Sequence, residues 1–433
     1  MKKLKYLVIV LLILASCTGS QTVSVKRSPI LFTGSPEGVG MLTERLGGID
    51  RMCQEAINAG EIPGAVALVA RNGRIVYHKA FGMADNQEGK PLKVDDIFRI
   101  ASQSKAITAT AVMMLWEKGI FRLDDPISKY IPEFKNPKLL DTFNPNDSSY
   151  TTVPAKGEIT IRHLLTHTSG LGYGMIDPDD RFRIIYQKAG IIDAFTSKDI
   201  TIEENIKKLA GLPLHFNPGE KFLYSEGLDV LGYFIEIVSG MSFDSFLREN
   251  IFDPLGMDDT WFYLPSDKAD RLVSVQEKSQ EGEWIHYKSD LYDMDYPVKG
   301  SKAFFSGGGG LSSTAKDYAT FLQMYLNGGE LNGIRILSRT TIRFMMANQI
   351  GDLRGKDSGA YYGLAFGVIN KKGQDMGGQG STGTFYWGGY FNTQYFADPV
   401  EKVIGILMKQ TQGNVTENTG WQFPILVEQA IDD

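Results

Sequence analysis

Two residues at the start of an apolar stretch have the types and the spacing of a nucleophile and its base. Ser102 and Lys105 are three positions apart, and the apolar residues after them recur at helical spacing as far as Gly119. If the helix begins at Ser102, both side chains lie on one face of it. The helix dipole favours negative charge developing on the hydroxyl, and an adjacent amine of lowered pKa can accept its proton. The pair therefore has the geometry for nucleophilic catalysis by serine.

A second Ser-x-x-Lys, formed by Ser313 and Lys316, follows a run of glycines. An ordinary structural interpretation is preferable there, because Ser312 or Ser313 can cap the helix that is expected to follow. The spacing alone therefore does not identify a catalytic serine, and the rest of the chain must decide between the two copies.

The elements expected before Ser102 are a helix and a hairpin. The helix covers about 41–59, and two β-prone runs, 64–70 and 74–81, flank Asn72-Gly73. Asn-Gly between two such runs is a strong hairpin signal. A short strand at 97–100 then leads into the Ser102 helix.

The rest of the chain is expected to be helical in the middle and to return to strands near the C-terminus. Helices are predicted at 160–166, 201–210, 228–238, 243–251, 314–327, 338–347 and 422–431. Strands are predicted at 363–369, 384–387, 392–397 and 403–408. Strands at both ends predict an α+β fold, in which one antiparallel sheet is flanked by helices. We expect a single domain from 41 to 433, with a mostly helical insertion over about 103–270.

The bulk composition excludes several classes of protein. The chain has 433 residues, 42% of them hydrophobic and 22% charged, with a net charge of −6. The acidic balance argues against a nucleic-acid partner. The five histidines form no H-E-x-x-H motif and no Cys/His pairing, so neither a metal site nor another cofactor is expected.

The N-terminus has the pattern of a processed export signal. Lys2, Lys3 and Lys5 precede an apolar run at 6–15, which ends in Leu14-Ala15-Ser16-Cys17. This ending resembles the lipobox of bacterial lipoproteins, which implies a signal peptide at 1–16, lipidation of Cys17 and a lipid-anchored linker at 17–40. The chain would then be an exported lipoprotein tethered to a membrane. The alternative is an ordinary secretory signal with an incidental cysteine.

Two later segments complete a recognisable set of motifs. Tyr224 stands just before a predicted helix in Tyr224-Ser225-Glu226, and Trp387-Gly388-Gly389-Tyr390 ends a predicted strand. Together with Ser102-x-x-Lys105 they resemble the serine β-lactamase and penicillin-binding-protein superfamily, on its class C side and nearest its esterase branch. The resemblance extends over about 45–430 and includes the stretches 159–171, 252–257 and 308–315. It identifies Ser102 as the nucleophile and places Ser313 in a glycine-turn helix.

The resemblance also implies a role for each motif residue. Tyr224 would bond to both Ser102 and Lys105, relay the proton and help to activate the hydrolytic water. The amides of Tyr390 and Ser102 would form the oxyanion hole, and Gly388 and Gly389 would let a substrate approach the strand backbone.

Two departures from the family pattern bear on the substrate. Glu226 stands where β-lactamases and peptidases have an asparagine that holds the substrate's acylamino group, and Trp387 replaces the lysine that attracts the substrate's carboxylate. Both changes favour a carboxylic ester over a β-lactam or a D-Ala-D-Ala terminus. A D-amino-acid peptidase, a class C-like β-lactamase and a non-catalytic, cell-wall-associated binding lipoprotein remain alternatives.

A Ser-His-Asp centre is the alternative form of serine catalysis. No G-x-S-x-G elbow occurs, and His163 and His167, four residues apart, have no acidic residue between them. We therefore interpret these histidines as packing and hydrogen-bonding residues. The regions 136–155 and 172–200 are expected to wall the site.

Overall fold

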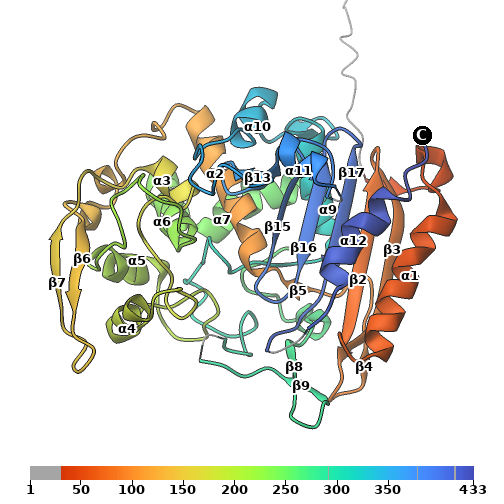
Figure 1. The fold of residues 1–433 in the computed structure, drawn as a ribbon, viewed down its shortest axis with the longest axis horizontal. Coiled ribbons are helices and arrows are strands. Elements are labelled where there is room, and N and C mark those ends of the chain that lie inside the picture. The colour runs from red at the N-terminus through yellow and green to blue at the C-terminus, as the bar shows by residue number, and fades with distance from the viewer. Residues whose placement is uncertain (1–30, 291, 378, 414–415) are drawn as a thin grey trace, which may run out of the picture.

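The computed structural model describes residues 31–290, 292–377, 379–413 and 416–433 (Figure 1). The predicted signal peptide and Cys17 lie outside the described residues. The last ten residues of the predicted linker, 31–40, are part of the folded domain, because β1 (Phe32–Thr33) pairs in parallel with β3 (Arg74–Asp85) and Arg71 Nη1 donates to the carbonyl of Gly40 at 3.0 Å.

The core of the molecule is a nine-stranded sheet built from both ends of the chain. Its strand order is β1-β3-β2-β17-β16-β15-β14-β13, with β4 (Lys90–Pro91) paired to β3. The other strands are β2 (Gly64–Arg71), β13 (Ala360–Tyr362), β14 (Gly367–Ile369), β15 (Phe385–Gly388), β16 (Gln394–Asp398) and β17 (Val403–Met408). All pairs except β1 with β3 are antiparallel, so the predicted sheet and α+β class are confirmed.

Alternation along β2 explains why helices cover both faces of the sheet. Ala65, Ala67 and Val69 belong to the core cluster under α1 (Thr43–Asn58) and α12 (Thr419–Glu428), while their neighbours Val66 and Leu68 belong to the main core. Helix α9 (Ala315–Leu326) lies on that other face (Figure 1). The turn between β2 and β3 uses Asn72 and Gly73, both with positive φ (51° and 75°), as a tight two-residue hairpin requires.

The remaining helices form a second region beside the sheet (Figure 1). They are α2 (Ser104–Glu117), α3 (Ile161–Leu165), α4 (Asp180–Ala189), α5 (Ile202–Ala210), α6 (Gly227–Ser239), α7 (Phe243–Leu247) and α8 (Asp253–Leu255), with α10 (Arg339–Met345) and α11 (Lys371–Asp375) nearer the sheet. Helix α2 is buried along most of its length, because it is apolar on nearly all sides and lies where the two regions meet.

Two segments for which the sequence predicted neither a helix nor a strand contain regular secondary structure. The polar stretch 136–155 contains a hairpin of β6 (Lys138–Phe143) and β7 (Tyr150–Pro154), and α4 lies within 172–200. The hairpin was missed because most of its residues are polar or exposed, and only Leu139, Leu140 and Phe143 among them pack partly against the core. It projects from the edge of the helical region, away from the sheet, in Figure 1.

Short strand pairs hold the segments around the predicted nucleophile. β5 (Phe98–Arg99) pairs with β10 (Ser312–Ser313), while β8 (Gln276–Lys278) pairs with β9 (Trp284–His286) and β11 (Glu330–Leu331) with β12 (Ile334–Arg335). The expectation that Ser312 or Ser313 caps the next helix was wrong. Thr314 is the cap, and its hydroxyl accepts from the amide of Asp317 at 3.1 Å.

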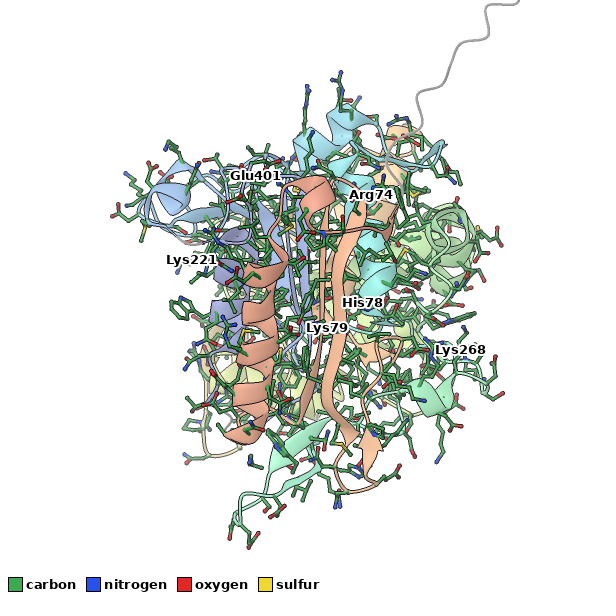
Figure 2. The ribbon with its side chains drawn as sticks, turned by 90° about the vertical axis from the view of Figure 1, so that its right-hand side faces the viewer. Arg74, His78, Lys79, Lys221, Lys268 and Glu401 are labelled. Carbon is green, nitrogen blue, oxygen red and sulfur yellow. The ribbon has the colours of Figure 1, made fainter. Side chains whose placement is uncertain are left out.

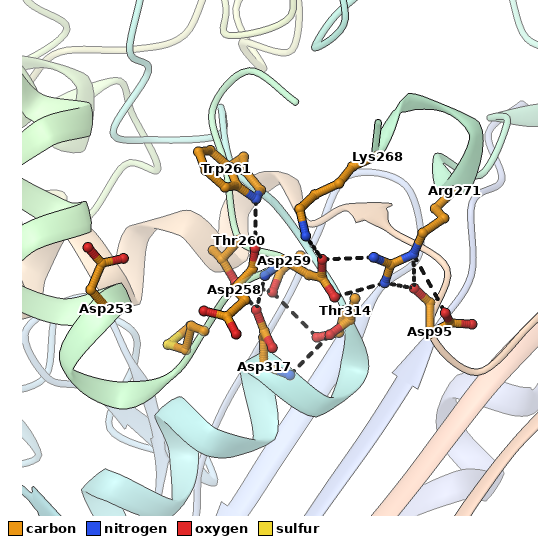
Figure 3. Close-up of polar contacts among 12 residues, drawn as sticks. Asp95, Asp253, Asp258, Asp259, Thr260, Trp261, Lys268, Arg271, Thr314 and Asp317 are labelled. Carbon is orange, nitrogen blue, oxygen red and sulfur yellow. Dashed lines mark hydrogen bonds and ion pairs between the residues drawn. The ribbon is translucent and has the colours of Figure 1, made fainter. Parts of the chain in front are cut away.

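A polar network anchors β10 to the loop after α8 (Figure 3). Asp317 accepts hydrogen bonds from the Asp259 amide (2.8 Å) and the Thr260 hydroxyl (3.0 Å), while Lys268 and Arg271 both pair with the Asp259 carboxylate at 2.6 and 2.8 Å. These bonds fix one side of the β5–β10 pair, which leads directly into the Ser102 turn.

The outer edge of the sheet carries charged side chains along β3. Figure 2 shows Arg74 and Lys79 on this strand, where Arg74 covers the ring of Phe32 at 3.4 Å and Lys79 pairs with Asp50 of α1 at 2.8 Å. Charged side chains on an edge strand oppose pairing with another chain.

Over the described part of the chain, no single helix is long and apolar enough to cross a membrane. Helix α6 and the segment Phe243–Leu255 meet the length and composition criteria only as a pair bent by 81°.

Candidate active site

Ser102 lies in a strained turn between β5 and α2. The turn Ala101–Gln103 is a 3₁₀ helix and α2 begins at Ser104, so the helix starts two residues later than expected. Ala101 has a φ of +44°, in the left-handed region that a residue with a side chain rarely adopts. The turn is held by hydrogen bonds from the Ile100 amide to the Leu311 carbonyl (3.0 Å) and from the Leu311 amide to the Ser104 hydroxyl (3.1 Å). The strain is thus built in immediately before the candidate nucleophile.

Lys105 is fully buried and its amine faces Ser102. The Nζ atom donates to Ser102 Oγ at 3.2 Å, to the Tyr173 hydroxyl at 2.8 Å and to the Gly308 carbonyl at 2.6 Å. These contacts hold the amine within proton-transfer distance of the serine hydroxyl. The two residues that the spacing indicated are therefore brought together.

Tyr224 is at the site, but its hydroxyl makes a different contact from the one that was expected. It accepts a hydrogen bond from Trp387 Nε1 at 3.3 Å, while Lys105 Nζ lies 4.6 Å from the centre of its ring. Among the described residues, no hydrogen bond joins the Tyr224 hydroxyl to Ser102 or Lys105.

Tyr173 is a site residue that the sequence analysis missed. Its hydroxyl accepts from Lys105, its amide donates to Asp177 Oδ2 at 3.0 Å, and its ring centre is 5.5 Å from that of Tyr224. Burial, with the neighbouring Tyr224 and Asp229, raises the pKa of Tyr173 well above its usual value, so it stays protonated at neutral pH. Its position two residues after the matched stretch 159–171 was the available signal.

The end of β15 lies against the Ser102 turn. A Cβ atom on Gly389 would fall 2.5 Å from the carbonyl oxygen of Ile100 and 2.3 Å from Thr393 Oγ1, so only glycine allows this approach. Gln412 Nε2 donates to the carbonyl of Tyr390 and orients that residue. Among the described residues, no hydrogen-bond acceptor faces the Tyr390 amide. This N–H group is thus available at the cavity that Ser102 lines.

The cavity at Ser102 has a volume of about 510 Å³ and mostly aromatic walls. It is lined by Tyr173, Phe195, Phe222, Tyr224, Tyr386, Trp387 and Tyr390, together with Gly388 and Gly389. Region 172–200 therefore does wall the cavity, through Tyr173 and Phe195 among others, whereas 136–155 does not. No described lysine or arginine side chain is among the lining residues.

Glu226 does not line the cavity, contrary to its predicted role in substrate binding. Its side chain is 1% exposed, and its buried carboxyl group lies against that of Asp193, with which it shares a hydrogen bond. Burial and the neighbouring charge of Asp193 raise the pKa of Glu226 well above its usual value, which favours the protonated form of the carboxyl group. The start of α6 turns this side chain inward because the Glu226 amide is bonded to the Gly172 carbonyl at 3.1 Å.

Two other carboxyl groups, those of Asp193 and Asp229, do line the cavity. Asp229 accepts from the Ser306 hydroxyl and from the Gly308 amide (3.2 Å), so Gly308 is held at its N–H by Asp229 and at its carbonyl by Lys105. Burial raises the pKa of Asp229, and the charge of Lys105 opposes this effect. The sequence analysis named neither aspartate.

The two histidines weighed above have structural contacts. His163 Nδ1 accepts from the Thr160 amide at 3.2 Å in the capping box of α3, and His167 Nδ1 lies 3.2 Å from Ser225 Oγ. Over the described residues, no group of three or more His, Cys, Asp or Glu side chains could hold a metal ion.

Comparison with known proteins agrees with this architecture. The family model described as Beta-lactamase matches residues 49–427, so the chain belongs to the β-lactamase family of serine hydrolases, which includes esterases and peptidases. Esterase EstB of Burkholderia gladioli is 31% identical over 84% of this chain and 90% of its own length, and protein Rv1367c of Mycobacterium tuberculosis is 32% identical over the same shares. The solved structure of EstCE1, a hydrolase with promiscuous acyltransferase activity, superposes with a TM-score of 0.74 at 26% identity, over 90% of this chain and 99% of that one.

Proposed function

We propose that this protein hydrolyses carboxylic esters through an acyl-enzyme on Ser102. The observation that carries the proposal is the 3.2 Å contact between Lys105 Nζ and Ser102 Oγ at a cavity with aromatic walls. Serine is a weak nucleophile and needs a base within hydrogen-bond reach, and Lys105 is the group in that position.

The reaction would follow from the positions of these groups. Lys105, as the neutral amine, accepts the Ser102 proton and becomes an ammonium group as Oγ attacks the ester carbonyl, and the amides of Ser102 and Tyr390 stabilise the negative oxygen of the tetrahedral intermediate. The intermediate collapses and expels the alcohol, which takes up the proton that the Lys105 ammonium holds; we assign its relay to the Tyr224 hydroxyl, because Lys105 Nζ lies 4.6 Å from the centre of the Tyr224 ring. Water then attacks the acyl-enzyme by the same steps. Tyr173 holds the Lys105 amine in place throughout.

The preference for esters rests on two features. Trp387 occupies the position at which a lysine would attract a substrate carboxylate, and its ring centre lies 5.7 Å from that of Tyr224, with the two planes tilted by 34°. The relative EstB carries the name of an esterase, and the structural neighbour EstCE1 is described as a hydrolase with acyltransferase activity. A cavity of this kind suits an uncharged acyl group better than an anionic β-lactam or a D-Ala-D-Ala peptide.

Two labelling experiments test the proposal. The protein is incubated with a fluorophosphonate and, separately, with a fluorescent penicillin, and the label is located by mass spectrometry. We expect fluorophosphonate on Ser102, turnover of p-nitrophenyl butyrate, and loss of both in folded Ser102→Ala. The absence of label and of ester turnover would favour a binding lipoprotein, and penicillin labelling with rapid release would favour a β-lactamase.

We also propose that the protein is exported and anchored to a membrane through lipidated Cys17. The support is the basic and apolar pattern that ends in Leu14-Ala15-Ser16-Cys17. Metabolic labelling with palmitate in a bacterial host should modify the wild-type chain and leave Cys17→Ala unlabelled. Equal labelling of both chains would contradict this proposal.

A further inference from the structure

The cavity at Ser102 combines aromatic walls with negative charge. Seven aromatic side chains line it, Asp193 and Asp229 supply the charged groups, and no described lysine or arginine side chain lines it. The one nearby amine, on Lys105, is already bonded to three acceptors. A substrate group in this cavity therefore meets carboxylates and ring faces, without a free cation.

Asp193 is held in a fixed position at the cavity wall. Its two carboxylate oxygens accept from the Gly174 amide (3.1 Å) and the Met175 amide (2.8 Å). Burial raises the pKa of Asp193, and hydrogen bonds from the Glu226 carboxyl group and from these two N–H groups oppose that effect by stabilising the ionised form. A cation in the cavity would favour the ionised form further. Burial and the charge of Asp193 raise the pKa of the adjacent Glu226 well above its usual value, so Asp193 is the member of this pair that ionises first.

Aromatic rings stand next to this carboxylate. The ring of Phe195, two residues after Asp193, stacks on that of Tyr390 with centres 6.5 Å apart and an angle of 26°. The rings of Tyr224 and Trp387 form a second pair across the site. Aromatic faces attract cations that have left water, most strongly trimethylammonium groups and other weakly hydrated ions.

We propose that the cavity selects esters that carry a positively charged amine, held by the Asp193 carboxylate and the faces of Phe195 and Tyr390. This inference rests on the proposed esterase function and adds a substrate class to it. The ammonium group can belong either to the acyl part or to the alcohol part of the ester. An anionic ester would bring a second negative charge to a site with no cation to receive it, and would react slowly.

Matched pairs of esters test the proposal and separate the two positions of the charge. For the alcohol part, butyrylthiocholine is compared with 3,3-dimethylbutyl thiobutyrate, in which carbon replaces the charged nitrogen. For the acyl part, p-nitrophenyl 4-(trimethylammonio)butyrate is compared with p-nitrophenyl 5,5-dimethylhexanoate, and mono-p-nitrophenyl glutarate serves as the anion. We expect the cationic member of at least one pair to have a kcat/KM at least tenfold higher than its neutral isostere, and the anion to be the slowest acyl substrate.

Substitution of the carboxylate then assigns the effect to Asp193. Asp193→Asn should lower the cationic-to-neutral ratio about tenfold, whereas Asp199→Asn, which removes an exposed charge from the same segment, should leave the ratio unchanged. If Asp193→Asn does not fold, Phe195→Leu removes one aromatic face and should lower the ratio about threefold. A ratio of one or less in both pairs for the wild-type protein would overturn the inference.

A binding measurement separates failure of this inference from failure of the proposed function. Calorimetry with Ser102→Ala should show tighter binding of the cationic ester than of its neutral isostere, independently of turnover. Fluorophosphonate labelling of Ser102 with no cationic preference would leave the esterase proposal standing and reject the inference. No labelling, with cationic preference retained in the binding measurement, would reject the esterase proposal and keep the cation site.

Discussion

The two Ser-x-x-Lys copies have the same spacing and different surroundings. Ser102 lies in a 3₁₀ turn after a strained residue and faces a cavity, and Lys105 is fully buried against it. Ser313 lies in β10 with its hydroxyl 2.8 Å from that of Thr260, and Lys316 is exposed on the first turn of α9. The comparison shows that a serine and a lysine three residues apart have reactive geometry only where the fold buries the lysine beside the hydroxyl.

Substitution of the lysine in each copy should give the largest difference in activity between the two. Lys105→Met should lower kcat for p-nitrophenyl butyrate by about 10³-fold or more, since it removes the candidate base and leaves a buried apolar side chain of similar length. Lys316→Met should leave kcat unchanged. Steady-state kinetics with circular dichroism as a control of folding gives the result. Equal activity of Lys105→Met and the wild type would rule out Lys105 as the base.

The approach of β15 to the Ser102 turn predicts the next largest effect. Gly389→Ala should lower kcat about 10²- to 10³-fold, because its Cβ would collide with the Ile100 carbonyl and displace the Tyr390 amide. Gly388→Ala is the matched control, with its nearest contact at 3.1 Å from the Thr393 carbonyl. Similar kinetics for both variants would show that the Tyr390 amide does not contribute to the oxyanion hole.

The two tyrosines at Ser102 are distinguished by their hydrogen bonds. Tyr224→Phe should lower kcat about 10²-fold by removing the group that is proposed to relay the proton. Tyr173→Phe should lower it about tenfold, because one acceptor of the Lys105 amine is lost while the other two remain. The opposite order, measured with p-nitrophenyl butyrate, would assign the proton relay to Tyr173.

The second Ser-x-x-Lys copy, at Ser313 and Lys316, is followed directly by Asp317, whose titration makes the stability of the fold depend on pH. Burial raises the pKa of Asp317 from its ordinary value of 3.8 to about 6. Between pH 4 and 6 the unfolded chain therefore releases this proton while the folded protein keeps it, so the free energy of unfolding falls as pH rises. Asp317→Asn removes this titration. The free energy of unfolding of the variant, taken relative to that of the wild type, should therefore rise by up to about 3 kcal/mol between pH 4 and pH 7. Urea unfolding at both values measures the difference.

The control for this stability experiment is Asp258→Asn, which changes an exposed carboxylate nearby. Its free energy of unfolding relative to the wild type should be nearly the same at pH 4 and pH 7. A difference between wild type and Asp317→Asn that does not change with pH would show that Asp317 is ionised at both values in the folded protein.

Local patterns in the sequence predicted most of the sheet and the main helices. The Asn72-Gly73 turn, the alternating strands and the apolar helices depend on neighbouring residues, so they could be read from the chain directly. The β6–β7 hairpin was missed because most of its residues are polar and exposed, whereas α4 was missed although Phe182, Ile185 and Tyr186 have helical spacing. The serine, lysine, tyrosine and tryptophan motifs likewise indicated which residues meet at the cavity.

The contacts within the site depended on the tertiary structure. Tyr173, Asp193 and Asp229 come from separate segments, and apart from the position of Tyr173 just after the matched stretch 159–171, nothing in their local sequence indicates that they line one cavity. Glu226 was expected at the substrate because a motif residue was assumed to face it, but the direction of a side chain depends on how its helix packs. The sequence by itself determined the reactive residue types and the family, whereas the folded chain decided which tyrosine bonds to the lysine and which carboxylates face the substrate.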